Sequence, residues 1–222
     1  VRHELKPAQV SQNLKIPSFL AVERSFVTAY LAETHLVARN AQQFEETLKT
    51  PCHAIFVNNS NLLGTFIALN SNGAVLPSFA DPEEMHALKK LGVNVLKIDR
   101  FAPGNTILAN NKAALVNTAI SKQVCKQISE CLGVPVLQHR LAGLGAHAST
   151  SVATNRGLLA FNEMTETELK LLEKMFSVEA SIGTANLGVP FNGLSVVANS
   201  HGALVGMHTT GFEIQRVYEA LF

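Results

Sequence analysis

The segment LNSNGAVL, residues 69–76, recurs in recognisable form three more times along the chain. Each copy has an apolar run, a polar turn, a small residue and a second apolar run. Aligned on the small residue, the copies follow one another at intervals of 40, 44 and 45 residues. A period of this length predicts an architecture built from structural repeats. The further copies are ANNKAALV at 109–116, ATNRGLLA at 153–160 and ANSHGALV at 198–205.

A second small residue supports the alignment, because it stands nine positions before the first one in every copy. These residues are Gly64, Gly104, Ala148 and Gly193. A fainter fifth copy, LAETHLVA at 31–38, places Leu36 at the position of the turn glycine. We therefore expect four clear units and a less clearly marked fifth one upstream.

Each unit predicts a β-hairpin. Two apolar, β-like runs around a polar turn are typical of a hairpin. The turn glycines Gly73, Gly157 and Gly202 suit left-handed turn conformations, which cost glycine nothing. Ala113 lacks that freedom, so we expect the third turn to differ.

A helix signal follows each hairpin. In residues 81–92, Asp81 can cap the first turn, Pro82 suits that turn and Gly92 ends the helix. Thr165, with Glu168 three residues later, predicts a capping box. The expected helices lie within 41–49, 81–92, 121–133, 165–176 and 209–222, and third strands are expected at 93–98 and 134–139.

A closed ring of β-β-α-β units accounts for these elements in an α+β fold. A sheet face and a helix stripe can share one core, so repetition about a centre places the sheets inside and the helices outside. A solenoid would need distinct capping units, and none is evident. With 222 residues, 47% of them hydrophobic, the chain can bury such a core.

Composition excludes several classes of protein. The net charge of +1 provides no long-range field to hold nucleic acid or an anionic membrane. Cys52, Cys125 and Cys131 form no CxxC pair and predict no disulfide framework, so we expect an intracellular protein. No apolar run is long enough to cross a membrane and no secretory leader is evident, which predicts a soluble protein.

Residues 183–221 closely resemble the last unit of the translation initiation factor 6 family, the ribosome anti-association factors of archaea and eukaryotes. The motifs GTAN, VVAN, ALVG and TTGFE stand there in the family's order and spacing. The resemblance covers residues 50–222 well and residues 1–49 only in outline. His208 departs from it, because the family usually carries an acidic residue at that position. Similar internal copies lie at 61–77, 102–116 and 147–159.

The resemblance implies the pentein fold, a five-bladed α/β propeller of quasi-repeated ββαβ units with pseudo-fivefold symmetry. Sheets would lie inside and helices outside. Residues 1–222 would form one domain. The expected units are 17–56, 57–98, 99–140, 141–182 and 183–222.

The resemblance also implies binding to the intersubunit face of the large ribosomal subunit, next to a bridge-region ribosomal protein and near the sarcin-ricin loop. Bound there, the protein would prevent the small subunit from joining, and a role in large-subunit biogenesis is expected. A eukaryotic member would also meet a release GTPase with its cofactor protein, and would occur in the nucleus and nucleolus. We otherwise expect a cytoplasmic monomer with no small-molecule cofactor and no membrane contact.

The family's motifs place the ribosome contact in the loops that enter the first strand of each unit. The constant offset of nine residues predicts that these loops lie at one end of the ring. Phe191 and Leu63, if exposed, would be apolar anchors, whereas the loop glycines could serve only tight turns. The expected ribosome-binding residues are Leu62, Leu63, Gly64, Thr65, Gly104, Asn105, Ala148, Ser149, Phe191, Asn192 and Gly193.

An alternative for the same fold is guanidine modification, as in deiminases and amidinotransferases. Those enzymes use a Cys nucleophile, a His base and carboxylates that hold the guanidinium. Asp81 is better explained as a helix cap, and Cys125 and Cys131 lie in a helical pattern that favours packing. His147 is expected in a loop without the partners of a metal site, and no nucleotide motif occurs. We therefore expect no catalytic residues and no enzymatic activity.

Overall fold

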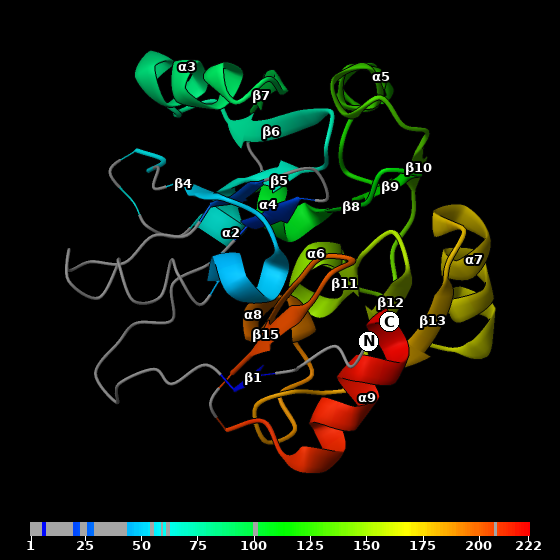
Figure 1. The fold of residues 1–222 in the computed structure, drawn as a ribbon. Helices are drawn as coiled ribbons and strands as arrows, with labels where there is room; N and C mark the ends of the chain where they lie inside the picture. The colour runs from blue at the N-terminus through cyan, green and yellow to red at the C-terminus, as the bar shows by residue number, and fades with distance from the viewer. Residues whose placement is uncertain are drawn as a thin grey trace.

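The computed structural model describes residues 6–7, 20–22, 26–28, 44–53, 56–58, 60, 63–99, 102–206 and 208–222, and Figure 1 shows their arrangement. Five three-stranded sheets lie within these residues. Named as first, middle and third strand, they are β2 (Leu20–Val22), β3 (Phe26–Thr28) and β4 (Cys52–His53); β5 (Ala68–Leu69), β6 (Gly73–Pro77) and β7 (Asn94–Ile98); β8 (Ile107–Ala109), β9 (Ala114–Val116) and β10 (Val136–Gln138); β11 (Val152–Ala153), β12 (Gly157–Ala160) and β13 (Glu179–Ile182); and β14 (Val196–Ala198), β15 (Ala203–Val205) and β1 (Lys6–Pro7).

All of these sheets share one topology. The middle strand pairs antiparallel with the first strand and parallel with the third. This confirms the predicted hairpin and third strand of the repeat. The last sheet differs only in that its third strand, β1, comes from residues 6–7, so the beginning of the chain completes the sheet formed by its end.

A longer helix lies between the middle and third strands of the first four sheets, and α9 follows β15 in the last. Residues 44–48 are helical, and the others are α3 (Pro82–Lys90), α5 (Lys122–Leu132), α7 (Glu166–Phe176) and α9 (Gly211–Leu221), which lie at the periphery in Figure 1. The capping box predicted at Thr165 and Glu168 is confirmed, and Gly133 ends α5 with φ +64°. Among these described helices, none is long and apolar enough to span a membrane.

The first strands contact one another in a fixed order. β2 contacts β5, β5 contacts β8, β8 contacts β11, β11 contacts β14, and β14 contacts β2. A hydrogen bond spans the junction between the end and the beginning of the chain, because Asn199 Nδ2 donates to Leu48 O at 2.7 Å. The last sheet therefore lies against the first.

Each of the four described hairpin turns, those of the last four sheets, binds the carboxyl end of the next unit's helix. The Asn70 side chain shows how: its Oδ1 accepts from the backbone of Asn72 and Gly73, and its Nδ2 donates to Leu132 O at 2.8 Å. Asn110 and Asn199 repeat this arrangement. One amide thus closes the turn and also satisfies a carbonyl that the helix itself leaves unpaired.

The turn glycines have a different role from the one predicted. Their φ angles are not in the left-handed region. Instead, a Cβ on Gly73, Gly157 or Gly202 would overlap a backbone oxygen of the neighbouring helix end, which comes from Cys131, Ala220 and Thr47 respectively. These glycines are required by the close approach of two backbones.

The expectation that Ala113 would change its turn is wrong. Its amide donates to Asn110 Oδ1 at 3.0 Å, as the amide of Gly73 does to Asn70 at 3.1 Å. The methyl group of Ala113 accompanies a longer hydrogen bond to the helix: Asn110 Nδ2 lies 3.3 Å from Phe176 O, compared with 2.8 Å from Asn70 Nδ2 to Leu132 O.

The first hairpin lies earlier than predicted. β2 and β3 place it at 20–28, whereas the sequence alignment placed it at 31–38 around Leu36, which lies outside the described residues. The residues between β2 and β3 are ERS, with neither Asn nor Gly. An alignment anchored on the turn glycine could not find this turn.

We predict that Gly157→Ala destabilises the protein by roughly 1–3 kcal/mol, because the added methyl group must push the end of α9 away. Chemical denaturation measures this change. Gly211→Ala is the matched control, since a Cβ there meets no atom within 4 Å and its φ needs no glycine. Equal stability of the two variants would contradict the close-approach argument.

Candidate partner-binding face

Four single-turn helices stand where the sequence predicted loops. They are α2 (Leu63–Phe66), α4 (Pro103–Thr106), α6 (His147–Thr150) and α8 (Asn192–Ser195), and each leads directly into the first strand of its sheet. α2 contacts α4, α4 contacts α6, and α6 contacts α8. We call the surface formed by these helices the short-helix face. The predicted grouping of these segments at one end is therefore observed, although the segments are helical.

Small residues allow these helices to pack closely. A Cβ on Gly104 would overlap Gly64 O, and a Cβ on Gly193 would overlap Ala148 O. None of these glycines has a left-handed φ. The tight-turn explanation therefore does not hold, and the nine-residue offset in the sequence reflects contact between neighbouring units.

The predicted contact residues divide into a buried layer and an outer layer. Leu63 and Asn192 are fully buried, and Gly104 and Ser149 are also buried. Asn192 Nδ2 donates to Ala160 O and Gly183 O at 3.1 and 3.0 Å, so its amide joins the end of β12 to the residue that follows β13. Leu62 lies outside the described residues. The partly or fully exposed members are Gly64, Thr65, Asn105, Ala148, Phe191 and Gly193.

Asn105 links two of the short helices. Its Oδ1 accepts a hydrogen bond from Ser149 Oγ at 2.9 Å, which ties α4 to α6. Because the oxygen is used in this way, the amide nitrogen is directed elsewhere. A partner meeting this face would therefore find an oriented amide at its centre.

Exposed apolar side chains gather at the last unit. Phe191 is 40% exposed and packs against Phe161 with ring centroids 6.1 Å apart, and Leu194 is 49% exposed. Leu187, in the loop before α8, is 68% exposed. Phe191 was expected from the sequence, whereas the two leucines were not, although apolar residues in a stretch that contains Gly and Pro are a visible signal.

A buried carboxylate holds the loop that carries Leu187. Glu213 of α9 accepts hydrogen bonds from the amides of Gly188 and Leu187 at 2.8 and 3.3 Å, and from Thr184 Oγ1 at 3.0 Å. Burial by itself raises the pKa of Glu213, but the hydrogen bonds from Thr210, Gly188 and Thr184 outweigh it, so the pKa is lowered. The ionised carboxylate fixes this loop to the first turn of α9.

His147 does not lie in a loop as predicted. It is the first residue of α6 and is fully buried, and within the described residues neither ring nitrogen has a hydrogen-bond partner. Burial lowers its pKa to about 4, and the carbonyls of His139 and Val116 only partly oppose that effect. The side chain is a neutral imidazole at physiological pH, at the position that Asn192 occupies in the next unit.

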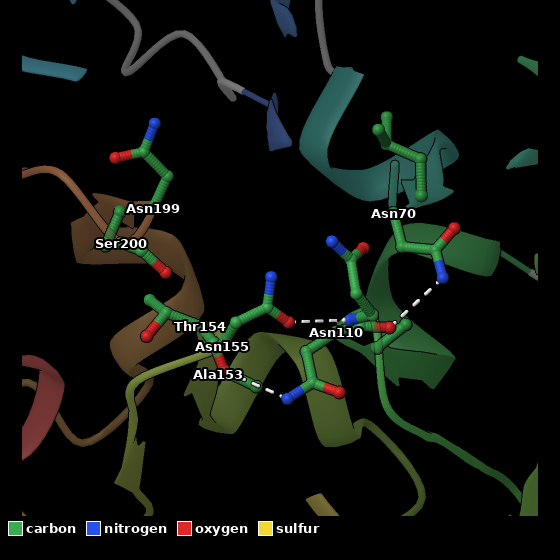
Figure 2. A pocket seen from close by; sticks show the side chains of 11 residues that line it. Asn70, Asn110, Ala153, Thr154, Asn155, Asn199 and Ser200 are labelled. Carbon is green, nitrogen blue, oxygen red and sulfur yellow. Dashed lines mark hydrogen bonds between the residues drawn. The ribbon is translucent and has the colours of Figure 1, made fainter. Parts of the chain in front are cut away.

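The four described hairpin turns line a small pocket at the other end of the first strands (Figure 2). Amide and hydroxyl groups of Asn70, Asn110, Asn155, Asn199 and Ser200 line it, and its volume is about 30 Å³. That space holds about two water molecules. Within the described part of the chain, no three His, Cys, Asp or Glu side chains are grouped as a metal site would require.

The two cysteines of α5 are poor nucleophiles. Cys131 is buried in α5, where burial raises its pKa to about 11, and burial also raises the pKa of Cys125. Because the thiolate is the reactive form, the raised pKa values disfavour a nucleophilic role for these two side chains at neutral pH. Neither cysteine lines the pocket between the turns.

Comparison with known proteins decides the family. The family model described as "eIF-6 family" matches residues 7–220. The chain belongs to this family. Translation initiation factor 6 from Pyrococcus horikoshii is 39% identical over 194 residues, which cover 84% of this chain and 86% of the relative. The factor of the same name from Saccharolobus islandicus is 43% identical over 170 residues, covering 74% and 76%.

Family membership agrees with the observed mixture of helices and small sheets. Translation initiation factor 6 from Picrophilus torridus is 38% identical over 180 residues, with 80% of this chain and 82% of the relative covered. The match to the eIF-6 family extends into the N-terminal segment, beyond the region where the sequence motifs were clear. The chain is thus a translation initiation factor by family.

We predict that protonation of His147 lowers stability at acid pH. Its pKa is about 4 in the folded protein and about 6.5 in the unfolded chain, so the unfolded state binds more protons between these values. The free energy of unfolding should keep its full value above pH 6.5 and fall by on the order of 3 kcal/mol as the pH approaches 4. Denaturation of the wild type and of His147→Asn at several pH values measures this loss.

His147→Asn is the informative variant because Asn192 shows that an amide fits the equivalent position. It should unfold with a weaker pH dependence in this range. An unchanged slope would show that other groups cause the acid sensitivity.

Proposed function

We propose that this protein is a ribosome anti-association factor that binds the intersubunit face of the large ribosomal subunit through its short-helix face, and so prevents joining of the small subunit. The observation that carries this proposal is membership of the eIF-6 family over residues 7–220. The geometry supports the choice of face, because exposed apolar groups gather there while the turn end uses its amides for internal bonds. The proposal includes a part in large-subunit biogenesis.

The proposed architecture is the pentein propeller of five ββαβ units. The order of contacts among β2, β5, β8, β11 and β14, which returns from the last strand to the first, supports it. In such a ring, one face presents equivalent segments of every unit to a partner. A monomer in the cytoplasm fits this mode of action, and a eukaryotic member would also enter the nucleus and be released by a GTPase with its cofactor protein.

The proposed mode of action is steric, with no catalytic step. A bound protein of this size occludes the surface on which the small subunit would dock. The raised pKa values of Cys125 and Cys131 argue against the alternative of a guanidine-modifying enzyme. The net charge of +1 indicates that close contacts, rather than a long-range field, hold the complex together.

We predict that Phe191→Ala and Asn105→Asp each weaken binding to large subunits by roughly tenfold or more. Phe191→Ala removes an exposed apolar anchor from the face. Asn105→Asp keeps the acceptor for Ser149 Oγ but places a negative charge in the middle of the face, which repels rRNA. Co-sedimentation with isolated subunits measures binding, and a subunit-joining assay measures function.

Leu137→Ala is the control, because Leu137 is an exposed apolar residue of β10 rather than of the short helices. It should bind and act like the wild type. If the wild type does not travel with large subunits, or joining proceeds equally in its presence, the proposal is wrong.

A further inference from the structure

A groove lies beside the short-helix face, between α7, β13 and α9, which Figure 1 shows as neighbours. Its volume is about 470 Å³. Leu169, Ile182 and Phe212 provide its apolar lining, and Ile182 and Phe212 are 44% and 68% exposed. An exposed apolar hollow of this kind is typical of an interaction site.

Phe212 departs from the pattern of the repeat. It is the second residue of α9, and the second residues of α3, α5 and α7 are Glu83, Gln123 and Thr167, all polar and exposed. The fold therefore has no need of an aromatic ring at this position. Phe212 exposes apolar surface that the equivalent helices avoid.

Ile182 departs in the same way. Ile182 pairs with Ala160, the fourth residue of the middle strand. At the equivalent position of the third strand, the two preceding sheets have Lys97, which pairs with Leu76, and Gln138, which pairs with Val116. Lys97 and Gln138 each donate to the carbonyl that precedes their own unit's helix, at Ala80 and Ile120. Ile182 cannot donate and remains exposed, so two independent departures from the repeat border one groove.

Leu187 is a third exposed apolar residue, and its backbone amide contacts the lining of this groove. Glu213, which lines the groove, holds the Leu187 amide. The Leu187 φ is +64°, in the left-handed region, and its side chain is 68% exposed. A bulky residue there costs conformational energy that glycine would avoid, and strain retained at an exposed site suggests function.

The charges favour a protein partner over RNA. Arg216 is the one cation among the described residues that line the groove. It lies over the Phe212 ring at 5.4 Å, and its Nη1 lies 3.6 Å from Glu219 Oε2. A phosphate backbone needs several cations that are free to replace counterions, and this groove does not supply them.

We propose that this groove binds an apolar segment of a protein partner on the large ribosomal subunit, as a continuation of the short-helix face. The loop from Thr184 to Gly188 joins the groove to Phe191 and α8, so one partner can cover both surfaces. This inference rests on the proposed function. It adds a second contact surface, the groove between α7, β13 and α9, which the sequence did not predict. It also specifies that a protein rather than RNA occupies this groove.

The test exchanges each apolar residue for the one that the repeat itself uses. Ile182→Lys can donate to Met164 O as Lys97 does to Ala80 O, and Phe212→Glu reproduces Glu83 in the first turn of α3. The double variant keeps the net charge, and its thermal midpoint should match that of the wild type. Its affinity for large subunits in co-sedimentation should fall by roughly tenfold or more, by a factor that is equal at low and high salt.

The matched controls separate the possible outcomes. Leu137→Ser exchanges an exposed β10 residue for its counterpart Ser181 and should bind normally. Leu187→Gly should unfold no more easily than the wild type yet bind more weakly. If the wild type binds and the double variant binds equally well, this inference fails alone, whereas a wild type that does not bind overturns the proposed function as well. A loss that shrinks steeply with salt would assign the groove to RNA and overturn the choice of partner.

Discussion

The contact between a hairpin turn and the carboxyl end of the next helix is the interaction on which the rest of the structure depends. Asn70 Nδ2 donates to Leu132 O, and Asn199 Nδ2 makes the same bond to Leu48 O across the two ends of the chain. In the two turns between these, the side chains of Lys112 and Arg156 donate to Ser177 O and Phe222 O, at the carboxyl ends of α7 and α9. Cations suit the partial negative charge of a helix carboxyl end. Each of the last four units thereby contacts its neighbour in the same way.

This contact explains why the two ends of the first strands differ. At the turn end, the side-chain amides of Asn70, Asn110 and Asn199 bind helix ends, and the remaining pocket is small and polar. At the other end, the short helices pack through small residues and leave their outer side chains for a partner. Among the described residues, the last unit has the most exposed large apolar side chains, which include Phe191, Leu194 and Phe212.

Buried polar groups show how far one position can vary within the repeat. Asn192 Nδ2 donates to the carbonyls of Ala160 and Gly183, whereas the equivalent His147 is neutral and without a partner in the described structure. Glu168 and Glu213 both cap their helices and also bind a loop amide of their own unit, at Ala142 and Gly188. The helix caps thus also position the loops that lead to the short helices.

The sequence by itself determined the period of the repeat, its hairpins and longer helices, the helix caps and the family. These features depend on local periodicity and on hydrogen bonds between residues close in the chain, and they are visible in segments such as TETELKLLEKMF. Only the tertiary structure decided that Gly73 and Gly104 serve close approach between units, that His147 is buried, and that β1 completes the last sheet. It also divided the predicted contact residues into a buried and an exposed layer. Those outcomes depend on packing between units, where residues far apart in sequence come into contact. A local sequence pattern does not show which distant residues come into contact.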